Sequence, residues 1–278
     1  MILRLPDGFD VALNMVWLRI IQDQREKKDL SPEVKAAGRL VVEACQFDHR
    51  MNREAHELQE MIEACLGSPE GVSSVERLLD RLKLSHSMYG LGFMEENRIF
   101  GALLAAQPLT VLNRLFGDGN LEDDGGMRGF FDHDELIGSP LDHVPQVTLL
   151  AWCDEDSAVR YPLIAARLCP FNKSHHSDVR QWKELALALL EHAPDKIEVL
   201  KHYIDQFHPR SYSGSRSAAW EANAKLLDVF VNDADVNLAE FARVEREKLR
   251  QCWTTSGGRN WRLRGARTNG LNKVSKFV

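Results

Sequence analysis

At 278 residues, with 44% hydrophobic and 27% charged residues, the chain is long enough to bury a sizeable core and needs neither disulfides nor a metal to fold. Its formal net charge of −6 and its pI of about 5.9 argue against nucleic acid as the main partner of the whole chain. No stretch approaches the roughly 18 uninterrupted apolar residues of a membrane span, and polar residues interrupt the N-terminal apolar stretch. We therefore expect a cytoplasmic protein without a signal peptide or a membrane partner.

Helical periodicity dominates the first 116 residues. A strong helix start stands at Ser31 and Pro32, because serine caps a helix and proline suits its first turn. Gly67 begins a break, and Pro108 predicts a kink within the last helix of this region. We therefore expect an irregular helical region at 1–116. Its predicted helices span 9–28, 32–46, 50–66, 72–84 and 97–116.

Residues 117–145 predict an acidic, glycine-rich loop and a boundary between two parts of the chain. They contain six glycines, and their eight acidic residues are accompanied by a single basic one, Arg128. The side chains around His133, together with Asp142 and His143, include carboxylates and imidazoles that suit a divalent cation. Their spacing matches no metal-binding motif, so we favour a solvated acidic loop and expect neither a metal nor a cofactor.

A weak repeat of about 40 residues runs through the C-terminal half. Acidic turns ending at Asp156, Asp195 and Asp235 lie 39 and then 40 residues apart. Each turn follows one apolar helical segment and precedes another, and its aspartate is suited to cap the second helix. The predicted helical pairs are 147–152 with 159–168, 185–190 with 197–207, and 224–230 with 238–249.

The first of these turns resembles a HEAT repeat. Residues 154–160 read DEDSAVR and are followed by Ala165-Ala166 and Leu168, which is similar to the turn and second helix of such repeats. The unit after Asp235 is similar but lacks the arginine, and the middle unit departs further. The resemblance, over about residues 141–253, implies a HEAT-like or armadillo-like α-solenoid of about three helical pairs at 146–256. Such a stack has a binding groove and usually no chemistry; a plain helical bundle with accidental spacing is the alternative.

Two polar segments are candidate binding surfaces. The loop at 207–216 joins two predicted helical pairs, and binding residues concentrate on loops that a rigid scaffold holds. The tail at 257–278 holds six basic residues and no acidic one. Its tryptophan among arginines suits stacking on a base while the cations contact phosphates; a tail that is disordered or folds back on an acidic face is the alternative. The candidate binding residues are Arg160, Arg210, Tyr212, Arg216, Arg259, Trp261, Arg262 and Arg264.

The sequence contains no recognisable catalytic motif. It lacks a P-loop, a G-x-G-x-x-G fingerprint and a G-x-S-x-G nucleophile elbow. The segment that starts at His56 begins like a zinc-protease motif, but Glu60 stands where the second histidine is needed. The polar residues at 175–178 are a weak metal candidate and are better suited to cap a helix that carries Trp182. The five cysteines form no C-x-x-C pair and predict buried thiols in a reducing compartment.

These observations predict an all-α, non-catalytic scaffold that binds another protein. Two alternatives stay open. The first is a nucleic-acid-associated helical repeat protein that uses the basic tail. The second is a metal-dependent enzyme centred on the acidic loop around His133.

Overall fold

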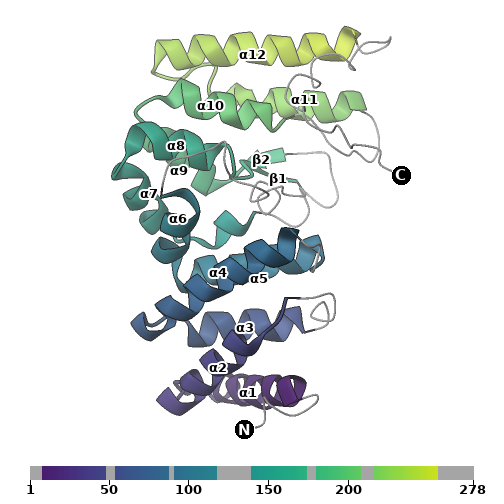
Figure 1. The fold of residues 1–278 in the computed structure, drawn as a ribbon. Helices are drawn as coiled ribbons and strands as arrows, with labels where there is room; N and C mark the ends of the chain where they lie inside the picture. The colour runs from purple at the N-terminus through teal and green to yellow at the C-terminus, as the bar shows by residue number, and fades with distance from the viewer. Residues whose placement is uncertain are drawn as a thin grey trace, which may run out of the picture. The chain divides into compact units, whose positions relative to one another are not determined.

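The computed structural model describes residues 8–47, 54–87, 91–117, 139–173, 180–207 and 216–255. Within these ranges the chain is mostly helical and contains one two-stranded sheet (Figure 1), which confirms the predicted all-α class. The chain divides into two compact units. Unit 1 comprises Met1–His175 and Gln181–Gln206, and unit 2 comprises His176–Arg180 and Phe207–Val278.

The N-terminal part of unit 1 contains six helices and a short 3-10 turn among its described residues. Most of their bounds lie close to the predicted ranges, because the local capping residues and the apolar periodicity used for the prediction also determine where the helices begin and end. Ser31 caps the second helix by accepting the Val34 amide at 3.3 Å, with Pro32 in the first helical position. The elements are α1 (Gly8–Arg25), α2 (Pro32–Ala44), α3 (Ala55–Cys65), η3 (Pro69–Gly71), α4 (Val72–Ser87), α5 (Phe93–Ala106) and α6 (Pro108–Phe116).

The rest of unit 1 contains two predicted helical pairs. Between these pairs in the sequence lie two short strands that pair with each other. Trp182 lies in the second strand, so the prediction that a helix carries it is wrong. The elements are η5 (Pro140–His143), α7 (Gln146–Asp154), α8 (Ser157–Ala165), β1 (Phe171–Lys173), β2 (Arg180–Trp182), α9 (Glu184–His192) and α10 (Lys196–Asp205).

The predicted kink at Pro108 is a complete break between two helices. Helices α5 and α6 are bent by 117° at this point. Gln107 between them has φ −140° and ψ 65°, because the proline ring disfavours a helical conformation in the preceding residue. Pro108 then occupies the first turn of α6, where its missing amide hydrogen costs nothing.

The predicted acidic loop ends earlier than residue 145. Residues 140–143 form η5, and Ser139 caps it by accepting the Leu141 amide at 3.3 Å. The Asp142 side chain accepts the Ser139 amide in return, which completes a capping box. Leu141 is fully buried and η5 packs against α5, so this end of the segment belongs to the core of unit 1. Residues 118–138 lie outside the described residues.

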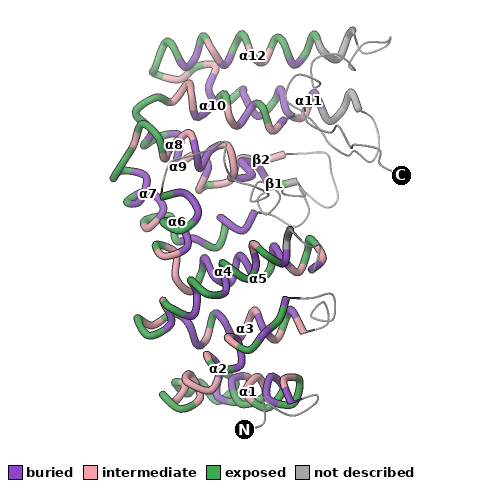
Figure 2. Tube along the Cα trace, in the orientation of Figure 1, coloured by how far each residue is buried: buried purple, intermediate pink, exposed green. Residues whose placement is uncertain are grey.

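Helices in unit 1 pack against neighbours that are close in sequence. Helix α1 contacts α2 and α3, and the pairs α2 with α4, α3 with α5, and α4 with α6 also pack. Beyond η5, α6 packs on α7, then α7 on α9 and α8 on α10. Buried positions recur along these helices (Figure 2). Helices α2 and α3 approach each other closely at Gly38, where an added Cβ atom would lie 2.4 Å from the Cys65 sulfur.

Unit 2 contains α11 (Arg216–Leu226), the short η6 (Leu227–Val229) and α12 (Val236–Thr255). The predicted helix at 238–249 lies within α12, but the bounds predicted for its partner at 224–230 are wrong, because α11 begins at Arg216 and ends at Leu226. Helices α11 and α12 pack together, with Trp220 and Leu238 among their buried side chains. Asn223 is fully buried and donates to the Phe207 carbonyl at 2.6 Å. This bond ties α11 to the segment that precedes it.

The acidic turns cap their helices in two of the three cases. Asp195 accepts the Glu198 amide at 2.9 Å at the start of α10. Asp235 accepts the Asn237 amide at 2.9 Å before α12. Asp156 precedes α8 without a side-chain cap bond, so the capping prediction is wrong there.

Among the described helices, none is by itself both long enough and apolar enough to cross a bilayer. Helices α5 and α6 meet that test of length and composition only together, as the pair bent by 117°.

Candidate functional site

Arg160 is the one candidate binding residue whose side chain the structure describes. Its guanidinium makes contacts within unit 1. It donates to the Trp152 carbonyl at 2.7 Å and to the Glu155 carboxylate at 2.6 Å. It also lies over the Trp152 ring, 4.2 Å from the centroid. Only 15% of the Arg160 side chain is exposed. This arginine therefore holds the turn between α7 and α8 together.

The surroundings of Arg160 are a packed core. The Trp152 indole donates to the Asn113 side chain at 2.7 Å and meets the Phe116 ring edge-on, which links α7 to α6. Burial raises the pKa of the Cys153 thiol to about 12, with a smaller contribution from the Asp154 charge. Burial and the 2.8 Å hydrogen bond that Tyr161 donates to Asp154 raise the pKa of the tyrosine. Both groups stay protonated at neutral pH.

The other candidate residues cannot be assembled with Arg160 into one site. Arg216 begins α11, and its side chain is outside the described set. The acidic stretch around His133 also lies outside the described residues. So do Arg210, Tyr212, Arg259, Trp261, Arg262 and Arg264.

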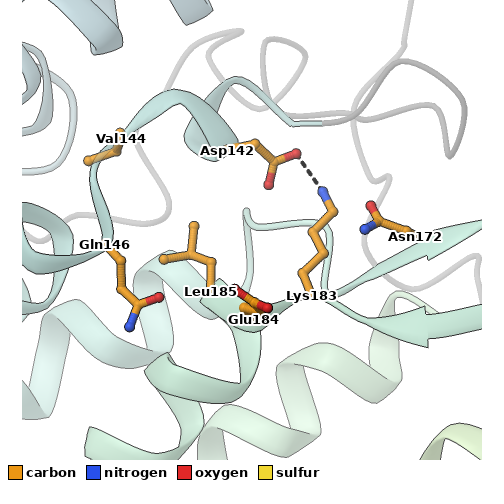
Figure 3. Close-up of a pocket in the computed structure, with 7 residues that line it drawn as sticks. All are labelled: Asp142, Val144, Gln146, Asn172, Lys183, Glu184 and Leu185. Atoms are coloured by element: carbon orange, nitrogen blue, oxygen red, sulfur yellow. Dashed lines mark hydrogen bonds and ion pairs between the residues drawn. The ribbon is translucent and has the colours of Figure 1, made fainter.

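Unit 1 contains a recess of about 450 Å³ that the sequence analysis did not predict. Figure 3 shows its walls, which come from η5, the start of α7, strand β1 and the start of α9. The lining residues are Asp142, Val144, Gln146, Asn172, Lys183, Glu184 and Leu185. Because η5 and α9 lie far apart in sequence, this recess exists only once unit 1 has folded.

An ion pair joins two walls of the recess. The Lys183 ammonium lies 2.5 Å from the Asp142 carboxylate, and just 10% of the lysine side chain is exposed. The same carboxylate oxygen accepts the Ser139 amide at 2.9 Å. Asp142 therefore fixes both the start of η5 and the residue that precedes α9. This contact gives a structural role to a carboxylate that the sequence analysis considered as a metal ligand.

The donors and acceptors of the recess suit binding of a neutral polar group. Helices α7 and α9 both begin there without a side-chain cap, and the first amides of a helix have no intrahelical acceptor. Asp142 is paired with Lys183, and the Glu184 carboxylate leaves the lining with a net negative charge, which disfavours an anion. The seven lining residues contain no hydroxyl, thiol or imidazole. Among the described residues, no three histidine, cysteine, aspartate or glutamate side chains gather in a metal-binding group.

A second exposed feature of unit 1 is an apolar stripe on α1. Val11, Met15 and Leu18 are 49%, 59% and 58% exposed, and their spacing places them on one face of the helix. The opposite face carries the buried Leu13 and Ile20, and α1 packs on α2 and α3. We call the exposed set the α1 stripe.

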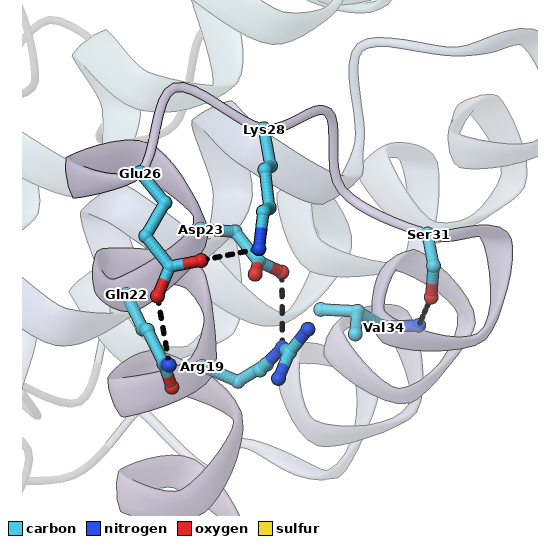
Figure 4. Close-up of polar contacts among 7 residues, drawn as sticks. All are labelled: Arg19, Gln22, Asp23, Glu26, Lys28, Ser31 and Val34. Carbon is cyan, nitrogen blue, oxygen red and sulfur yellow. Dashed lines mark hydrogen bonds and ion pairs between the residues drawn. The ribbon is translucent and has the colours of Figure 1, made fainter.

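Polar contacts fix the C-terminal end of α1 (Figure 4). Arg19 lies 3.0 Å from the buried Asp23 carboxylate, and Lys28 lies 2.5 Å from Glu26. Lys27, between Glu26 and Lys28, adopts a φ of 53°, which reverses the chain toward α2. The direction of α1, and with it the α1 stripe, is therefore set by local contacts.

No family model, curated protein or solved structure matches the chain. The resemblance to HEAT repeats thus stays a prediction, and function has to be inferred from the residues and their geometry.

Proposed function

We propose that this chain is a non-catalytic helical-repeat scaffold that binds another protein. The observation that carries the proposal is the packing order of unit 1, in which helices contact the next helix or the next but one. Such nearest-neighbour packing is typical of helical repeats, where each pair buries its apolar face against the following pair. It leaves an extended surface of helix ends and turns, which repeat proteins use to bind partners.

Side chains that donate hydrogen bonds to carbonyls at the ends of earlier helices support the same layout. Arg81 donates to the Cys45 carbonyl, and Gln107 donates to the Leu66 carbonyl. Gln206 donates to the Ala165 carbonyl at 2.7 Å. These partners are separated by 36, 41 and 41 residues, close to the spacing of the acidic turns. These spacings support a repeat-like layout in residues 1–116 as well, where the sequence predicted only irregular helices.

The recess is the place where we expect the partner to bind. The uncapped amides at the starts of α7 and α9 suit the backbone carbonyls of a polypeptide, which bring no charge near Asp142 and Glu184. Val147 follows the lining residue Gln146 in α7 and is 75% exposed, so an apolar side chain is available to a partner that binds beside the polar groups. A polypeptide offers both kinds of group, whereas a nucleic acid would bring phosphates toward the net negative charge of the lining.

Affinity capture with the full chain tests this proposal. The chain is used as bait at low and high salt, and captured protein and nucleic acid are identified separately. Val147→Glu adds a carboxylate next to the lining residue Gln146 and is expected to abolish capture of the partner protein. Val236→Glu is the matched control, because Val236 is equally exposed at the start of α12 in unit 2.

The outcomes separate the scaffold from its alternatives. A protein captured by the chain and by Val236→Glu, but lost with Val147→Glu, supports binding at the recess. Equal capture by both variants, or no captured protein, contradicts it. Capture of nucleic acid that weakens with salt and disappears on deletion of 257–278 would instead favour the basic tail as the binding element.

A further inference from the structure

The α1 stripe is an apolar face that no described helix of unit 1 covers. The three aliphatic side chains are exposed next to one another along one helix face and are not scattered singly. The nearest helices, α2 and α3, pack on the opposite side of α1. Since α2 and α3 pack on one side of α1, its other face is available for a further helix.

We propose that the α1 stripe joins two copies of this chain through antiparallel packing of their α1 helices. The inference is independent of the proposed scaffold function, since it uses a different surface. Leu18 lies near the middle of the helix, and a two-fold axis beside it brings the two Leu18 side chains together. Met15 and Val11 of each copy then face the C-terminal half of the other helix.

Charge complementarity supports this register. Asp10 stands eight residues before Leu18, which places it about 12 Å along the helix from the two-fold axis. Arg25 stands seven residues after Leu18, about 10.5 Å from the two-fold axis in the other direction. Antiparallel packing therefore places Asp10 of one copy level with Arg25 of the other, on the same flank of the interface. Both residues are exposed, and neither has an ion-pair partner among the described residues. Parallel packing would instead place Asp10 of one copy level with Asp10 of the other, on opposite flanks, and would form no Asp10–Arg25 pair.

A single helix from each copy makes a small interface, so the dimer is expected to be weak and concentration-dependent. Sedimentation equilibrium of the full chain, from about 1 µM to about 500 µM, measures its dissociation constant. Leu18→Glu is expected to weaken dimerisation by at least about tenfold, because it buries two carboxylates at the axis. The control is Leu84→Glu on α4, where the leucine is 62% exposed, and its dissociation constant is expected to match the unmodified chain. Circular dichroism verifies that each variant is folded.

Charge reversal tests the register. Asp10→Lys and Arg25→Glu are each expected to weaken the dimer several-fold, because each creates like-charge pairs, and the double variant is expected to restore it. Two results would overturn the proposal: a dimer that survives Leu18→Glu, or a double variant that dimerises no better than the singles. A chain that is monomeric at every concentration would also overturn the proposal. Residues 1–7 or another protein would then be the candidates to cover the α1 stripe.

Discussion

Long polar side chains connect the helices of unit 1 at their ends. The last carbonyls of a helix have no intrahelical donor, and an amide or guanidinium from a later element supplies one. Gln107 shows the arrangement most clearly, because its side-chain nitrogen donates at 2.7 Å to both the Leu66 and Ser68 carbonyls. These contacts fix α5 and α6 on the end of α3.

Replacing Gln107 tests the strength of this contact. We expect Gln107→Ala to lower the free energy of unfolding by about 1–3 kcal/mol, because the partly buried Leu66 carbonyl loses its side-chain donor and the Ser68 carbonyl keeps only the Gly71 amide. Gln22→Ala is the control. Gln22 is exposed and binds only Glu26 within its own helix, so a change below about 0.5 kcal/mol is expected. Urea unfolding measures both, and equal effects would show that the Gln107 contacts do not stabilise unit 1.

Buried thiols make stability depend on alkaline pH. Burial raises the pKa of Cys65 to about 11, from an ordinary value of 9.0. Above pH 9 the unfolded thiol therefore loses a proton that the native thiol keeps, so stability present below pH 9 falls as the pH rises toward 11. Cys65→Ser removes the titrating group. Its unfolding free energy should decline less than that of the unmodified chain, by about 1 kcal/mol, between pH 9 and 10. Parallel declines would contradict a shifted pKa at Cys65.

Helices are the scale at which the sequence is most informative. Serine, proline and aspartate signals are local, so Ser31 and Asp195 identify helix starts without any knowledge of the fold. The break at Pro108 was predicted in position but not in size, because the proline limits the preceding residue while packing sets the angle. Trp182 was misassigned, since pairing with β1 rather than local propensity makes its segment a strand.

Two aspartates at equivalent turns test the capping argument. Asp195 accepts the Glu198 amide, and Asp195→Ala should cost about 1 kcal/mol of stability. Asp156 occupies the same place before α8 but makes no cap bond, so Asp156→Ala should cost less than about 0.5 kcal/mol. Thermal unfolding of the two variants gives the comparison. A larger loss for Asp156→Ala would contradict the assigned caps.

At the scale of the whole molecule, the recess escaped prediction because it depends on packing. Asp142 and Lys183 are 41 residues apart, and neither lies in a motif that names the other. Arg160 was selected for its place in a HEAT-like turn, but the sequence gives no sign that the Trp152 ring and carbonyl occupy its guanidinium. Periodicity predicts which residues are helical, whereas a site requires knowing which helix ends meet.

The central claim is that helices of unit 1 are stabilised mainly by their neighbours in the chain. Amide hydrogen exchange in a Leu13→Ala variant tests it most directly, because Leu13 is buried where α1 meets the following helices. Nearest-neighbour packing predicts faster exchange in α1, α2 and α3, with α9 and α10 exchanging as in the unmodified chain. Equal acceleration from α1 through α10 would contradict a repeat-like stack and favour a single cooperative bundle.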